Sequence, residues 1–253
     1  MKIKVAINNL LNKFGYRVSR TNEVNMPIEA TKRDLEILGL VREYTMTSHE
    51  RIWALMSAIR YVTTLRMSGD FVECGVWRGR SAMVMALTLL DLGLSNKKIW
   101  LYDTYEGMTE PTSEDIEFCS GELAETLLRR VSKKSQARDI WCFSQIDDVA
   151  TNLRSTGYPM SNVNLIKGDV LHTLNVDIPD QISLLRLDTD WYYSTKKELE
   201  LLYPKLQTGG VCIIDDYGYW GGSKKAVDEY LKDNEISVLL HRIDNTARLF
   251  IKP

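Results

Sequence analysis

The sequence predicts an α/β fold with a mostly parallel sheet, and two stretches carry this prediction. In the first, two short apolar runs at residues 182–187 and 211–214 flank a segment with helical spacing. In the second, the strand-like residues 71–74 precede two glycines, an apolar helix at 82–92 and another apolar run at 99–103. Strand–helix–strand units of this kind have right-handed crossovers that make their strands parallel.

Aspartates end both runs of the first stretch. Asp188 and Asp190 follow residues 182–187, and Asp215 and Asp216 follow residues 211–214. Thr195-x-x-Glu198 has the form of a capping box that opens the intervening helix, and residues 208–210, Thr-Gly-Gly, end it. Because ligands of open α/β sheets bind at the carboxyl edge, we expect several carboxylates to converge at one site there.

The composition fits a globular protein with one sizeable core. The 253 residues are 44% hydrophobic and 26% charged. A formal net charge of −2 gives no basic field, so we expect no nucleic-acid partner. The four cysteines lie far apart without a C-x-x-C pair, which favours reduced thiols in a cytoplasmic protein. No apolar run reaches the roughly 18 residues of a membrane span, so we expect no integral membrane segment.

Residues 1–43 are expected to form a helical N-terminal extension, and residues 44–253 a single domain. The first twenty residues alternate basic and apolar side chains and lack the uninterrupted apolar core of a secretory signal. This segment either packs on the domain or a twin subunit, or rests on an anionic membrane surface. We favour packing, which makes a homo-oligomer the expected assembly.

A helix and a glycine turn open the domain. Thr47-x-x-Glu50 predicts a capping box, and the helix it begins ends by Gly69. The glycine spacing that follows, E-x-G-x-x-x-G from Glu73, differs from the G-x-G-x-x-G that cradles a pyrophosphate. An acid at Glu73 would repel a diphosphate and attract a cationic aminoacyl group, which disfavours a nicotinamide oxidoreductase. The alternative is that Glu73 only partners helix N–H groups.

The remaining elements complete the sheet. Asp103, at the end of the second strand, is placed to accept hydrogen bonds from ribose hydroxyls, or is a turn residue. Residues 164–169 form a further strand ending in Gly-Asp, and residues 236–243 and 247–252 form a hairpin joined at Asp244-Asn245. The acidic residues 105–120 are either a flap over the carboxyl edge or a solvated surface. Five parallel strands followed by an antiparallel hairpin form the plan of the class I methyltransferase sheet.

Four sequence elements resemble the macrocin O-methyltransferase family. They are E-C-G-V-W-R-G-R-S, Y-D-T-Y-E-G-M-T-E-P, L-D-T-D-W-Y-x-S-T-K-x-E-L and G-G-V-x-I-I-D-D-Y-G-x-W, within residues 44–230. The resemblance implies a Rossmann-like domain that uses S-adenosylmethionine (SAM) and a divalent metal, with Mg²⁺ expected, to methylate sugar hydroxyls in antibiotic biosynthesis. It does not extend to residues 1–20.

The resemblance also implies roles for individual residues. Asp188, Asp215 and Asp216 would hold Mg²⁺, and Asp188 would also be the catalytic base. The residues expected to bind SAM are Tyr44, Met46, Thr47, Glu73, Gly75, Ser81, Asp103, Gly168 and Asp169.

The chemistry of methyl transfer calls for such a metal site independently. An alcohol has a pKa near that of water, about 15.7, and an unperturbed Asp has one near 3.9. A gap of roughly 12 units at about 1.36 kcal/mol each is on the order of 16 kcal/mol, which is too large for a lone carboxylate. A hard cation stabilises the forming alkoxide, and neighbouring sugar hydroxyls chelate it.

We therefore predict a SAM- and metal-dependent O-methyltransferase acting on a sugar hydroxyl in a natural-product glycoside, a polysaccharide precursor or a nucleotide-linked sugar. A catechol-type phenol is the first alternative acceptor, because an ortho-diol chelates a metal in the same way. The second alternative is a non-enzymatic SAM-binding or scaffold protein, against which the three aspartates weigh.

Overall fold

The computed structural model describes residues 26–42, 47–130 and 141–253. Residues 31–253 form one compact unit. The N-terminal residues 1–20 and the predicted SAM contacts Tyr44 and Met46 lie outside the described residues. No helix in the described part of the chain is long and apolar enough to cross a membrane.

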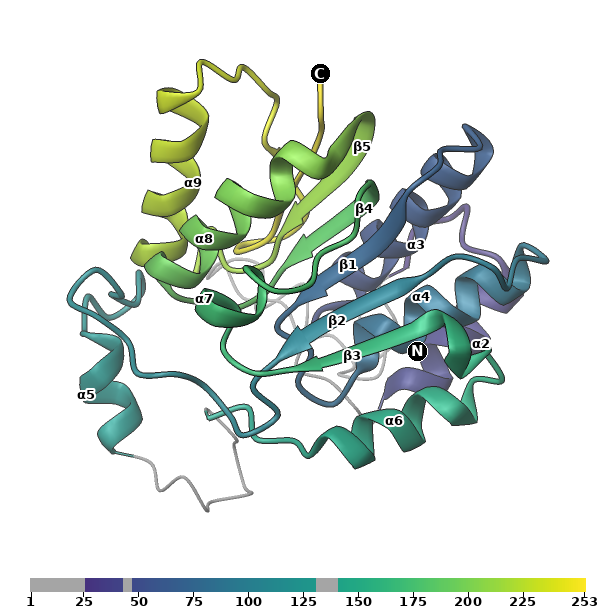
Figure 1. The fold of residues 1–253 in the computed structure, drawn as a ribbon, viewed down its shortest axis with the longest axis horizontal. Helices are drawn as coiled ribbons and strands as arrows, with labels where there is room; N and C mark the ends of the chain where they lie inside the picture. The colour runs from purple at the N-terminus through teal and green to yellow at the C-terminus, as the bar shows by residue number, and fades with distance from the viewer. Residues whose placement is uncertain (1–25, 43–46, 131–140) are drawn as a thin grey trace, which may run out of the picture. The chain divides into compact units, whose positions relative to one another are not determined.

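A seven-stranded sheet forms the centre of this unit, in the order β3-β2-β1-β4-β5-β7-β6 (Figure 1). Strands β1 to β5 are parallel, and β7 runs antiparallel to β5. The strands are β1 (Asp70–Cys74), β2 (Ile99–Asp103), β3 (Val163–Lys167), β4 (Ile182–Leu187), β5 (Leu206–Ile214), β6 (His241–Arg242) and β7 (Arg248–Ile251). The predicted parallel sheet with a C-terminal antiparallel hairpin is confirmed.

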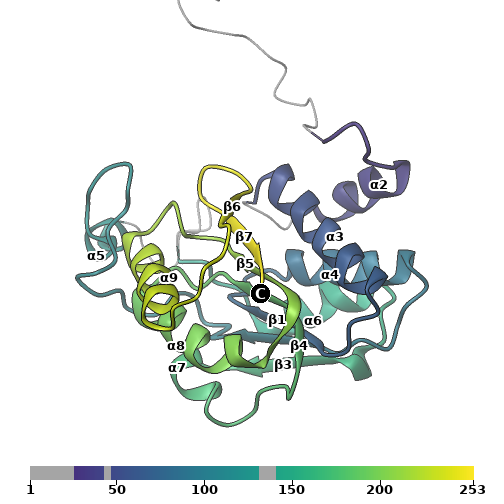
Figure 2. The same ribbon diagram turned by 90° about the horizontal axis from the view of Figure 1, so that it is seen from above.

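Helices cover both faces of the sheet, as Figures 1 and 2 show. One face carries α7 (Val170–Thr173), α8 (Tyr192–Leu202) and α9 (Gly221–Asp233), and the other carries α3 (His49–Thr64), α4 (Arg80–Asp91) and α6 (Ile146–Ser155). Strand β4 is buried at all six positions, as expected for a parallel strand covered on both sides.

Two further helices lie outside these layers. Helix α2 (Lys32–Val41), which the sequence analysis placed in the N-terminal extension, packs against α4 within the compact unit. Helix α5 (Ala124–Arg129) follows the acidic loop. Two short 3₁₀ turns, Met160–Asn162 and Tyr203–Lys205, precede β3 and β5.

Both predicted capping boxes are wrong. Ser48 rather than Thr47 caps α3, since its side chain accepts the Arg51 N–H. Helix α8 begins at Tyr192 because Asp115, from a distant loop, accepts the Tyr192 N–H at 2.8 Å. A tertiary contact therefore overrides the local signal at Thr195, which lies inside the helix.

The end of α8 and the start of the hairpin also differ from expectation. Helix α8 ends at Leu202, because Pro204 lies in the 3₁₀ turn that follows, and residues 208–210 belong to β5. The first hairpin strand is only two residues long. Ile236, Val238 and Leu240 pack against the main core instead of extending β6, which explains their apolar spacing.

Candidate active site

The carboxyl ends of the central strands place Gly75, Asp188 and Asp215 in one row. The backbone ladder continues past the strand ends: Gly75 N–H donates to Tyr102 O at 2.9 Å, Asp188 N–H to Cys74 O at 2.8 Å and Asp215 N–H to Leu187 O at 2.9 Å. Above this row lies a cavity of about 820 Å³. The predicted convergence of carboxylates at this edge is thus observed.

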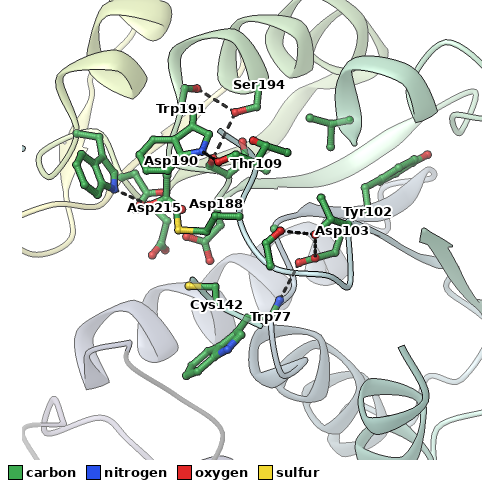
Figure 3. A pocket seen from close by; sticks show the side chains of 18 of the residues that line it. Trp77, Tyr102, Asp103, Thr109, Cys142, Asp188, Asp190, Trp191, Ser194 and Asp215 are labelled. Atoms are coloured by element: carbon green, nitrogen blue, oxygen red, sulfur yellow. Dashed lines mark hydrogen bonds between the residues drawn. The ribbon is translucent and has the colours of Figure 1, made fainter. Parts of the chain in front are cut away.

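The cavity has two chemically different ends (Figure 3). Asp103 and Tyr102 lie at one end, and Asp188, Asp215 and Trp191 lie together toward the other. Among the residues predicted to bind SAM, those that line the cavity are Thr47, Gly75, Asp103, Gly168 and Asp169.

The turn after β1 is built around Gly75 and Asp103. Gly75 has φ +82°, and a Cβ there would lie 1.9 Å from the backbone oxygen of Asp188. One oxygen of Asp103 accepts the N–H groups of Val76 at 2.6 Å and Trp77 at 2.9 Å, and the other accepts that of Tyr105 at 2.7 Å. Asp103 therefore has the turn role weighed from the sequence. Carboxylate oxygens have further lone pairs, so ribose binding stays a prediction.

Glu73 and Ser81 do not line the cavity. Glu73 is 1% exposed and lies behind the Gly75 turn, and Ser81 is buried in α4. Burial raises the pKa of Glu73 to about 7, although its ion pair with Arg186 acts in the opposite direction. Contact between either side chain and SAM stays a prediction.

Asp188, Asp215 and Asp216 offer carboxylate oxygens that lie within 4.8 Å of one another. Adjacent strand residues point to opposite faces, but β5 has already ended at Ile214. The backbone turns there, with Asp216 O accepting the N–H groups of Tyr219 and Trp220. This turn allows both neighbouring carboxylates to reach one site.

This trio fits a divalent cation. One carboxylate oxygen of Asp216, Oδ2, is buried without a hydrogen-bond partner in the described part of the chain. Burial raises the pKa of Asp216, and the charges of Asp190 and Asp215 add to the effect. Hard carboxylate oxygens at this spacing are the donors that Mg²⁺ prefers. A cation would satisfy the unpaired oxygen and offset the mutual repulsion.

Two arginines that the sequence patterns did not predict contact the aspartates. Arg51 of α3 is ion-paired with Asp215, and its Nε donates to Asp244 at 2.7 Å. Arg186 of β4 lies 2.7 Å from both Asp188 and Asp215. The sequence did contain an indication of Arg186. It is the one charged residue in the apolar run 182–187, and at two positions before Asp188 it lies on the same face of the strand.

Aromatic side chains form the wall of the other end. The rings of Trp191 and Trp220 are 4.9 Å apart in an edge-to-face arrangement, and Tyr219 contacts Trp220 in the same way at 5.0 Å. Trp220 Nε1 donates to Asp190 at 2.7 Å. Trp191 Nε1 donates to Thr109 O at 3.1 Å and so ties the acidic loop to this wall. Whether that loop acts as a flap stays a prediction.

Comparison with known proteins identifies the family. Residues 4–252 match the model of the family Macrocin-O-methyltransferase (TylF), so the expectation that residues 1–20 fall outside the resemblance is wrong from residue 4 on. The chain belongs to this family. The predicted family, the O-methyltransferase class and the class I methyltransferase fold are therefore confirmed.

Several named methyltransferases are similar to much of the chain. Demethyldecarbamoylnovobiocin O-methyltransferase of Streptomyces niveus is 29% identical over 201 residues, which are 79% of this chain and 72% of that protein. An 8-demethyl-8-(2,3-dimethoxy-alpha-L-rhamnosyl)-tetracenomycin-C 4'-O-methyltransferase of Streptomyces olivaceus is 30% identical over 204 residues, covering 81% and 74%. The solved structure of the O-methyltransferase NovP has a TM-score of 0.74 at 25% identity, covering 87% of this chain and 97% of that one.

Proposed function

We propose that this chain transfers the methyl group of SAM to a hydroxyl group of a sugar, with a divalent cation held by Asp188, Asp215 and Asp216. The observation that carries the proposal is the convergence of these three carboxylates in one cavity that several of the predicted SAM-binding residues also line. Several relatives are named for methylation of glycosylated antibiotics or their sugars, which supports a sugar acceptor. Cytoplasmic location and a homo-oligomer stay predictions.

SAM suits the end of the cavity formed by Gly75, Asp103 and Gly168. Gly75 and Gly168 line this end, the missing side chain of Gly75 lets the Asp188 backbone approach closely, and Asp103 keeps the first turn rigid. SAM supplies an electrophilic methyl group on a sulfonium, and a divalent cation lowers the pKa of a hydroxyl group that it binds. The negative potential of the surrounding aspartates favours the positively charged cofactor.

Asp188 is placed to take the acceptor proton. It lines the cavity, and its side chain is 28% exposed, whereas those of Asp215 and Asp216 are buried. Arg186 contacts both Asp188 and Asp215, and Arg51 contacts Asp215 as well, so of the two Asp188 is the less heavily paired carboxylate. Asp188 accordingly accepts the proton, while Asp215 and Asp216 provide negative charge and fixed ligand positions for the cation.

The aromatic wall suits the acceptor. Trp191, Trp220 and Tyr219 present ring faces and edges on which the apolar face of a sugar stacks. Tyr219 is 39% exposed, so this wall continues to the mouth of the cavity. A sugar placed against the wall would direct a hydroxyl group toward the aspartates.

Radiolabelled methyl transfer tests the proposal. The purified chain is incubated with methyl-labelled SAM and a panel of glycosides, nucleotide-linked sugars and catechols, with Mg²⁺ or with EDTA. We expect label in a sugar hydroxyl, with Mg²⁺ only. Transfer to a catechol alone would contradict the acceptor class, and transfer unchanged by EDTA would contradict the metal.

A further inference from the structure

Arg186 is a buried cation in the centre of the sheet. It is 3% exposed, on strand β4, with its Cα opposite that of Glu73 in β1 and that of Ile213 in β5. Its Cα therefore lies two residue positions before the row of Gly75, Asp188 and Asp215. An arginine at such depth is rare unless it is paired.

The guanidinium contacts three carboxylates from three neighbouring strands. Nη1 donates to Glu73 Oε1 at 2.6 Å and lies 2.7 Å from Asp188 Oδ2, and Nη2 lies 2.7 Å from Asp215 Oδ1. The guanidinium fork brings two nitrogens against three carboxylates at once, which the single nitrogen of a lysine ammonium cannot reproduce. Each contact also selects one oxygen of the carboxylate that it touches.

We infer that Arg186 is a positioning residue that fixes Asp188 and Asp215 in the orientation in which they share a cation with Asp216. This inference rests on the proposed metal site. Arg186 holds Oδ2 of Asp188, so the other oxygen is directed toward the cavity. Groups that orient metal ligands from behind typically matter for metal affinity.

The competing explanation is that Arg186 only neutralises Glu73. That role would stabilise the fold without affecting the aspartates. A simple charge deletion would not separate the two explanations, because removing a cation next to a metal site also removes its repulsion of the metal. The informative variants are therefore those that conserve the total charge.

Two such variants are available. Arg186→Lys keeps the charge and loses the fork. The double variant Glu73→Gln/Arg186→Met removes both members of the ion pair, so no unpaired Glu73 is left buried and the net charge is unchanged. Arg60→Lys is the matched control, because Arg60 is ion-paired with the buried Asp34 outside the cavity lining.

The measurement is Mn²⁺ binding by each chain without SAM, from the electron paramagnetic resonance signal of the free ion, with melting temperatures recorded in parallel. We expect both Arg186 variants to bind Mn²⁺ about 10- to 100-fold more weakly than the unchanged chain. Arg60→Lys is expected to change the melting temperature alone.

Three outcomes have distinct meanings. Weaker Mn²⁺ binding by both folded Arg186 variants supports the inference. Mn²⁺ affinity equal to that of the unchanged chain in either folded variant overturns it, while the proposed metal site stands. If the unchanged chain binds no Mn²⁺, the metal site itself is wrong and the inference fails with it.

Discussion

Replacing Asp188 by Asn is expected to lower kcat by about 10²- to 10⁴-fold, the range that loss of a general base produces. The amide cannot take the acceptor proton, and it offers a weaker ligand to a cation. Its NH₂ group would also face the donors of Arg186, which now lie 2.7 Å from Oδ2. The measurement is single-turnover methyl transfer at saturating SAM and Mg²⁺.

The affinity for S-adenosylhomocysteine is expected to stay unchanged in Asp188→Asn, because the Gly75 and Asp103 end of the cavity is intact. Asp228→Asn is the control, since Asp228 pairs with Lys224 on α9 and does not line the cavity. Full turnover by Asp188→Asn would show that another group accepts the proton.

Replacing Gly75 by Ala is expected to have the largest effect on stability. The added Cβ would lie 1.9 Å from the Asp188 backbone oxygen, and the residue must keep φ +82°. A left-handed conformation costs about 1–2 kcal/mol and overpacking about 1–3 kcal/mol. We expect the free energy of unfolding to fall by about 2–5 kcal/mol, the sum of these terms, in urea denaturation.

Gly93→Ala is the matched control for Gly75→Ala. Gly93 has φ +72°, but a Cβ there meets nothing within 4 Å. The free energy of unfolding of Gly93→Ala is expected to fall only by the cost of the left-handed conformation, about 1–2 kcal/mol. If both variants lost the same free energy of unfolding, the backbone at Asp188 would be able to move away from the added Cβ without an energetic cost. The turn would then be less rigid than its hydrogen bonds indicate.

The sequence was informative where local patterns and sheet geometry coincide. Apolar runs of strand length ending in Asp188 and Asp215 are sufficient to place both residues at one edge, because parallel strands share their direction. Consecutive apolar residues within each run make both faces of the strand apolar. This pattern is expected for a sheet that helices cover on both faces. These features depend on short stretches of chain, which is why they were predictable.

Other features depend on contacts between distant segments. Asp115 caps α8 across 77 residues, so the start of the helix could not be read from Thr195. Arg51 reaches Asp215 from a helix 164 residues earlier in the chain. Arg186 was within reach of the sequence, because a charge inside a buried strand requires partners, and Glu73 is the other buried charge at the matching position.

The roles of Asp103 and Glu73 show a second limit. Asp103 is the last residue of β2 and Glu73 is the last but one of β1, so both were expected to face the cofactor. In the structure, Asp103 fastens the Gly75 turn through backbone N–H groups, and Glu73 lies behind it against Arg186. Strand position indicates the edge on which a side chain lies, but the neighbouring turn decides what that side chain contacts.

One cavity is proposed to bind SAM and a divalent cation side by side. The most direct test is the melting temperature of the purified chain with S-adenosylhomocysteine or NAD⁺, each with and without Mg²⁺. At about 100 times its dissociation constant a ligand stabilises by about 2.7 kcal/mol, a shift of roughly 5–10 °C for a chain of this size. We predict such a shift with S-adenosylhomocysteine, a further rise with Mg²⁺ and none with NAD⁺. A shift with NAD⁺ alone would contradict the cofactor, and the lack of any effect of Mg²⁺ would contradict the metal site.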